Sequence, residues 1–92
     1  MAEESVLDPV TVYQRDIAWV EACDAMIAEV STPSHGVGYE IAYAIGLGKP
    51  VLCLYRQGAR ISKMVTGNTE PMLTVESYEG ESGALGVAQK FL

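Results

Sequence analysis

The sequence predicts an α/β fold of three layers, in which helices cover both faces of a doubly wound, mostly parallel sheet. Two observations support this prediction. Segments 25–30 and 51–55 are short and almost continuously apolar, as strands of a buried parallel sheet are. Segments with helical spacing of apolar residues precede, separate and follow them, so helices and strands alternate along the chain. A length of 92 residues, 49% of them apolar, predicts one packed domain over residues 1–92.

The first predicted helix begins at an Asp-Pro pair. Asp8 can cap the helix, and Pro9 suits its first position because proline lacks the N–H that would go unpaired there. Apolar residues recur at helical spacing from residue 10 to residue 20, so the helix is expected to end near Cys23. The strand at 25–30 follows. Residues 31–38, rich in hydroxyl side chains and turn formers, are then expected to form a loop.

The second half of the chain is expected to continue this alternation. A helix from about Gly38 to Leu47 would end at Gly48, since glycine commonly terminates helices. The further elements are predicted in chain order as a strand at 51–55, a short helix around 61–65, a weaker strand at 72–75 and a helix from Ser82 through Phe91.

The predicted sheet is thin, with three strands and one side of the first strand unpaired. A doubly wound sheet usually begins with a central strand, and the loop after that strand cradles a phosphate. An exposed apolar strand edge also favours aggregation. We therefore expect the fold to be truncated at its N-terminus by one strand–helix unit, unless a partner covers the edge.

Charge and composition exclude several classes of protein. The net charge of −6 comes without a cluster of basic residues, which argues against binding of a nucleic acid polymer. The apolar runs are too short to span a membrane, and the acidic N-terminus does not resemble a secretory signal. Cys23 and Cys53 lie inside apolar runs and are expected to be free thiols in a reducing compartment. A single histidine and two distant cysteines do not suggest a metal site, and no cofactor is expected.

The segment 34–40 carries the clearest chemical signal. Gly36 and Gly38 allow a ligand to approach the backbone, and a helix N-terminus favours an anion. Glu40 is expected in the first turn of that helix, where the helix dipole would favour its ionised form. The alternative is an ordinary capped helix, in which Ser34 supplies a turn hydroxyl and Glu40 only complements the dipole.

Asp16 is the second carboxylate of interest, because it borders the apolar stripe of the first helix. Two carboxylates that face one cleft can divide the work of glycosidic bond cleavage. One attacks the anomeric carbon and the other handles protons, and in retaining enzymes the two lie about 5 Å apart. The alternative is that Asp16 is a solvated residue on the flank of the helix that pairs with Arg15 or with another neighbour.

Four segments carry a resemblance to a known family: YQRDIAW at 13–19, AEVSTPSHGVGYE at 28–40, KPVLCLYR at 49–56 and RISKM at 60–64. Residues 10–92 as a whole resemble the 2′-deoxynucleoside 5′-phosphate N-hydrolases, which belong with the nucleoside 2-deoxyribosyltransferases and have a Rossmann-like fold. The resemblance implies hydrolysis of the N-glycosidic bond of deoxynucleoside monophosphates, with free base and 2-deoxyribose 5-phosphate as products.

The resemblance also implies roles for single residues. Glu40 matches the nucleophile that forms a covalent intermediate with the sugar, and Asp16 matches the second catalytic carboxylate. Ser34 and Gly36 match positions that contact the phosphate and the sugar, with Gly38 in the same substrate-binding loop. Ser62 matches a serine that reaches the ligand of the neighbouring subunit. The expected assembly is therefore a homodimer, located in the cytoplasm or also in the nucleus.

The chain departs from the family pattern before residue 10, where the family has a strand, a glycine-rich loop and a catalytic tyrosine. This departure keeps a second hypothesis open, a catalytically inactive nucleotide-binding or dimerisation module. A third is a nucleoside 2-deoxyribosyltransferase that passes the sugar to another base. His35 stands where the family often has an aliphatic residue. Trp19 and Tyr39 either pack in a core or dimer face or stack on a base, and Arg56 and Arg60 are candidate phosphate ligands.

Overall fold

The computed structural model describes residues 8–92. The expectation about a secretory signal falls largely on residues 1–7, outside the described residues. The elements follow in the order α2 (Pro9–Ala22), β1 (Met26–Glu29), α3 (His35–Gly46), β2 (Val51–Arg56), α4 (Lys63–Thr66), β3 (Leu73–Tyr78) and α5 (Gly80–Phe91). The predicted alternation of helices and strands is confirmed. None of the helices within residues 8–92 is long and apolar enough to cross a membrane.

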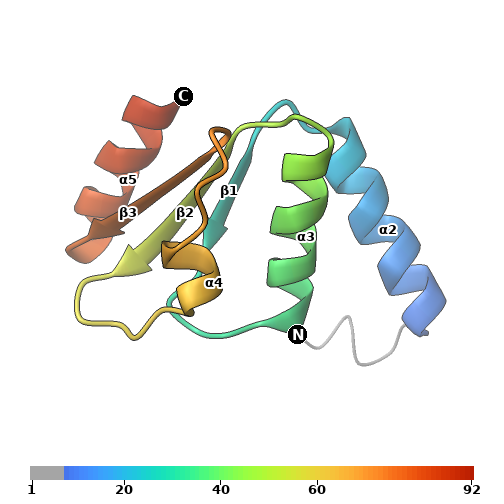
Figure 1. The fold of residues 1–92 in the computed structure, drawn as a ribbon, viewed down its shortest axis with the longest axis horizontal. Coiled ribbons are helices and arrows are strands. Elements are labelled where there is room, and N and C mark those ends of the chain that lie inside the picture. Colours follow the sequence, from blue (N-terminus) through green and yellow to red (C-terminus); the bar gives the residue numbers. More distant parts are fainter. Residues whose placement is uncertain (1–7) are drawn as a thin grey trace.

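The three strands form one parallel sheet with β2 in the centre (Figure 1). Val51 of β2 aligns with Met26 of β1 on one side and with Leu73 of β3 on the other. Since all strands run in the same direction, their carboxyl ends meet at one edge of the sheet. The loops that follow β1 and β2 begin at this edge, and the first of them leads to the 34–40 segment.

Helices cover both faces of the sheet, so the predicted three layers are confirmed. On one face, Val51 and Cys53 of β2 pack with Ile41 and Ala44 of α3, and Val20 of α2 joins this cluster. Helix α2 packs beside α3 (Figure 1). Successive residues of a strand point to opposite faces, and the opposite face of β2 and β3 is covered by α5.

Strand β2 is the most deeply buried element, with Val51, Leu52 and Cys53 fully buried. Full burial of a side chain such as Leu52 contributes about 2 kcal/mol. Burial in this apolar environment also raises the pKa of the Cys53 thiol. Strand β1 differs, because within residues 8–92 it pairs only with β2, and Ile27 is 42% exposed. The expected unpaired side of the first strand is therefore present.

Several predicted boundaries shift in the structure. Helix α3 begins at His35, earlier than predicted, because the Ser34 hydroxyl accepts a hydrogen bond from the Val37 N–H (3.2 Å) and caps the helix. Strand β3 extends to Tyr78, and α5 begins at Gly80 rather than at Ser82. The prediction for Gly48 is confirmed: it adopts φ +77° just after α3.

Candidate active site

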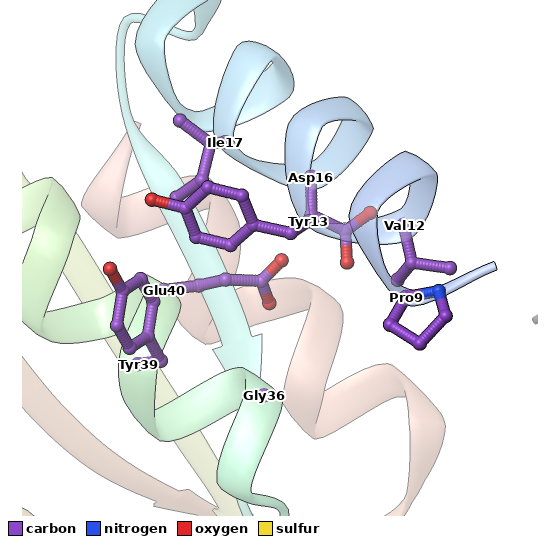
Figure 2. A pocket seen from close by; sticks show the side chains of 8 residues that line it. All are labelled: Pro9, Val12, Tyr13, Asp16, Ile17, Gly36, Tyr39 and Glu40. Atoms are coloured by element: carbon purple, nitrogen blue, oxygen red, sulfur yellow. The ribbon is translucent and has the colours of Figure 1, made fainter.

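A pocket of about 370 Å³ lies between α2 and α3. The carboxylates of Asp16 and Glu40 reach into it from the two facing helices (Figure 2). Its remaining lining is mostly apolar and aromatic, and consists of Pro9, Val12, Tyr13, Ile17, Gly36 and Tyr39. Two helices that are separate in the sequence thus bring the two predicted carboxylates to one cavity.

Asp16 combines both of the interpretations that its sequence position allowed. The Arg15 guanidinium lies within 3.0 Å of its Oδ1, through both Nε and Nη2. The Asp16 side chain is only 24% exposed and lines the pocket. Arg15 also stacks on Trp19, with its guanidinium carbon 4.8 Å from the ring centroid. The ion pair therefore restricts the orientation of a carboxylate that faces the cavity.

Glu40 lies on the same pocket, but its predicted position in the first turn of the helix is wrong. Because Ser34 caps the helix, Glu40 falls in the second turn, and the first turn of α3 contains no acidic residue. The favourable effect of a helix N-terminus on an anion fades beyond the first turn. Glu40 is half-buried, and together with Asp16 it also lines a second hollow along β1, beside Met26 and Ile27.

Tyrosine side chains form one wall of the pocket. The rings of Tyr13 and Tyr39 meet edge to face with centroids 6.1 Å apart, and Tyr39 stacks on Tyr43 at 6.5 Å. Hydrogen bonding with Tyr39 raises the pKa of the Tyr13 hydroxyl. Both rings are about half-exposed. In the sequence Tyr13 belongs to the apolar stripe of the helix, and its position three residues before Asp16 puts the two side chains on neighbouring parts of one helix face.

The other predicted site residues lie in a separate pocket of about 240 Å³. Ser34, Gly38 and Ser62 line it, together with Arg60 and His35. The Ser62 hydroxyl caps α4 by accepting a hydrogen bond from the Met64 N–H (3.2 Å), much as Ser34 caps α3. Within one chain, the predicted residues therefore divide into two groups: Asp16, Gly36 and Glu40 line the first pocket, and Ser34, Gly38 and Ser62 line the second.

The aromatic and basic candidates are distributed unevenly. Trp19 is 63% exposed and lines the hollow along β1, so within the described chain it is not a core residue. Arg56 ends β2 and stands near Glu29, away from both pockets, whereas Arg60 lines the second one. Within residues 8–92, no group of three or more His, Cys, Asp or Glu side chains is placed to hold a metal ion.

The fold and the first pocket together define a class: an open parallel α/β sheet protein with two carboxylates facing one cavity from adjacent helices. The chain belongs to the nucleoside 2-deoxyribosyltransferase family, whose model matches residues 4–83. The family predicted from the four sequence segments is thereby confirmed.

Individual relatives agree with this assignment. The chain is 42% identical over 92 residues to a candidate 2′-deoxynucleoside 5′-phosphate N-hydrolase of Trichoplax adhaerens, covering 97% of this chain and 64% of that protein. It is 45% identical over 75 residues to a protein of the same name from Methanosarcina mazei, covering 82% and 47%. It is 48% identical over 58 residues to the mouse 5-hydroxymethyl-dUMP N-hydrolase, covering 61% and 34%.

The fold has a similar solved structure. A CMP N-glycosidase from Clostridium botulinum superposes with a TM-score of 0.82 at 23% identity, covering 96% of this chain and 74% of that one. This likeness supports the three-layer α/β fold. The chain spans about half the length of the curated relatives it matches.

Proposed function

We propose that this chain carries the machinery to hydrolyse the N-glycosidic bond of 2′-deoxynucleoside 5′-monophosphates, which yields free base and 2-deoxyribose 5-phosphate. The observation that carries the proposal is the meeting of Asp16 and Glu40 at one pocket. The relatives are named as deoxynucleotide N-hydrolases, and these names support the same reaction class.

In the proposed mechanism, the Glu40 carboxylate attacks C1′ of the sugar. The bond between C1′ and the base nitrogen breaks, and the base leaves with the electron pair and takes up a proton. A water molecule then attacks C1′, breaks the ester to Glu40 and restores the carboxylate. Asp16 assists the proton transfers and orients the sugar, while Arg15 restricts its position.

The second pocket suits the 5′-phosphate of the substrate. It joins the hydroxyls of Ser34 and Ser62 to the Arg60 side chain and the backbone at Gly38. Gly36 links the two pockets, because a Cβ there would stand 3.9 Å from the Ser34 hydroxyl oxygen. In the proposed assembly, a homodimer in the cytoplasm or also in the nucleus, Ser62 serves the neighbouring subunit's ligand. The partner is a mononucleotide, not a nucleic acid polymer or a membrane.

The test is to incubate the purified chain with each of the four deoxynucleoside monophosphates and to measure free base by chromatography. We expect base release, and Glu40→Gln should lower its rate at least about a thousandfold, as loss of a nucleophile does. Glu76→Gln is a matched control, because Glu76 is an exposed carboxylate on β3 that lines neither pocket. Undiminished release by Glu40→Gln would contradict the mechanism.

Two alternatives remain, each with its own observation. The division of the predicted site residues between two pockets within one chain favours an inactive nucleotide-binding or dimerisation module. Calorimetric binding of deoxynucleotides without base release would identify it. The family description favours a 2-deoxyribosyltransferase, which would form a new nucleoside when a second base is added as acceptor.

A further inference from the structure

A polar cluster lies at the carboxyl edge of the sheet, outside both pockets. Its centre is Glu29, the last residue of β1. The Glu29 carboxylate accepts hydrogen bonds from the Ser31 N–H (2.5 Å) and from the Ser31 hydroxyl (2.8 Å). It also accepts a short hydrogen bond from the Tyr78 hydroxyl, at the end of β3. One side chain thus connects the first and third strands of the sheet.

Ser31 extends the cluster to the central strand. Its hydroxyl oxygen accepts a hydrogen bond from the Arg56 N–H at the end of β2 (2.8 Å). The preceding residue, Val30, donates its N–H to the Leu54 carbonyl (2.8 Å), continuing the pairing of β1 with β2. The backbone that leaves β1 is therefore held at residues 30 and 31, by all three strands together.

The held segment leads directly to the proposed site. Only Thr32 and Pro33 separate Ser31 from Ser34, and proline has a restricted φ angle. Ser34 caps α3, and α3 carries Gly36 and Glu40 to the pocket. A change at Ser31 would therefore reach the start of α3 with little flexible chain between them.

The charges within the cluster favour hydrogen bonds that persist near neutral pH. Burial raises the pKa of Glu29, but the hydrogen bonds from Tyr78 and Ser31 and the nearby Arg56 charge outweigh it, so the net shift is downward. The hydrogen bond to Glu29 also raises the pKa of Tyr78. Near neutral pH the carboxylate thus remains an acceptor and the phenol a donor.

We propose that Glu29 is a positioning residue, whose hydrogen bonds to Ser31 and Tyr78 hold the 31–34 segment and thereby the start of α3 in the geometry needed at the two pockets. Its effect on the reaction rests on the proposed function, whereas its effect on the segment does not.

The test compares Glu29→Gln and Tyr78→Phe with Glu76→Gln. Glu76 is also a carboxylate on a strand, and among the described residues it accepts no hydrogen bond from the 31–34 segment. Amide hydrogen exchange is followed at Ser31 and Val37, with Leu52 on the buried central strand as the reference. We expect exchange at Ser31 and Val37 to accelerate at least about tenfold in both test variants, as loss of a hydrogen bond to a charged group permits. Leu52 and the control should change little.

Base release is measured on the same samples and separates the two proposals. If wild type is active, the test variants should raise KM for the monophosphate more than they lower kcat. If neither the wild type nor any variant releases base, the proposed function fails. Accelerated exchange would then still support the role of Glu29 in holding the 31–34 segment. Unchanged exchange at Ser31 and Val37 would overturn the proposed positioning role of Glu29. Equal acceleration at Leu52 in both test variants would also overturn it, because Glu29 would then stabilise only the fold.

Discussion

At the scale of single residues, the candidate site depends on how carboxylates are held. Asp16 is paired with Arg15, which at the same time stacks on Trp19. Glu29 is held by hydrogen bonds from Ser31 and Tyr78. Each carboxylate has partners that restrict its rotamers, although neither side chain is fully buried. Asp16, which lines the first pocket, is thus oriented by Arg15, which does not line it.

The contact of Arg15 with Trp19 gives a spectroscopic prediction, since Trp19 is the only tryptophan of the chain. Arg15→Met should change the indole emission intensity, because it removes the cation above the ring. The cost in stability should be about 1 kcal/mol, because the ion pair and the cation–π contact are only partly shielded from solvent. Fluorescence and urea unfolding of the same sample measure both. Unchanged emission would argue against the stacking.

The lowered pKa of Glu29 predicts a pH dependence of stability. Its folded-state pKa lies below the ordinary value of 4.5, so its ionised form stabilises the fold above that pH. This contribution should disappear as the pH falls through the folded-state pKa. Urea unfolding between about pH 3 and 6 should show stability falling with acidification. Glu29→Gln should flatten this slope, and an equally steep slope in that variant would contradict the assignment.

At the scale of elements, caps and connections decide how the helices present the site. Ser34 begins α3, and Lys49 joins the end of α2 to the start of β2. The Lys49 ammonium donates hydrogen bonds to the carbonyls of Glu21 (2.6 Å) and Cys23. Helices α2 and α3 line opposite sides of the first pocket. The Ser34 cap at the start of α3 and the Lys49 contacts at the end of α2 therefore both matter for the width of that pocket.

Removal of the Ser34 cap is expected to destabilise the start of α3. Ser34→Ala should destabilise the fold by about 1 kcal/mol, because the Val37 N–H loses its acceptor. Ser34→Asn is the matched variant, since asparagine caps helices about as well as serine. Urea unfolding of both variants tests this. An equal loss in both would indicate that Ser34 matters for a reason other than capping.

At the scale of the whole molecule, the sheet is small and unevenly covered. Helix α5 covers β2 and β3 on its face, whereas Ile27 of β1 is 42% exposed and Trp19 beside it is 63% exposed. Strand β1 pairs on one side only among the described residues. Exposed apolar edge strands favour association, and small domains have little stability in reserve.

We therefore expect the chain to be marginally stable or to self-associate. Its melting midpoint should rise with protein concentration, and sedimentation should detect oligomers. Ile27→Lys should weaken association, whereas Leu85→Lys, an exposed apolar position on α5, should not. A high, cooperative and concentration-independent melting midpoint in a dilute monomeric sample would contradict this view of the sheet.

What the sequence determined by itself was local. Apolar periodicity placed the helices and strands, and the Asp8 and Gly48 signals placed a start and an end, because these depend on neighbours within one turn. The four segments at 13–19, 28–40, 49–56 and 60–64 together were enough to predict the family. The turn of α3 that holds Glu40 was predicted wrongly, because two glycines concealed where the Ser34 cap begins the helix.

The tertiary structure alone decided which distant residues meet. The pocket shared by Asp16 and Glu40 depends on how α2 packs beside α3, and the separate pocket of Ser34 and Ser62 depends on where α4 lies. The hydrogen bond between Tyr78 and Glu29 joins strands that are not neighbours in the sheet. Such contacts follow from strand order and helix packing, which no periodicity within a single segment encodes.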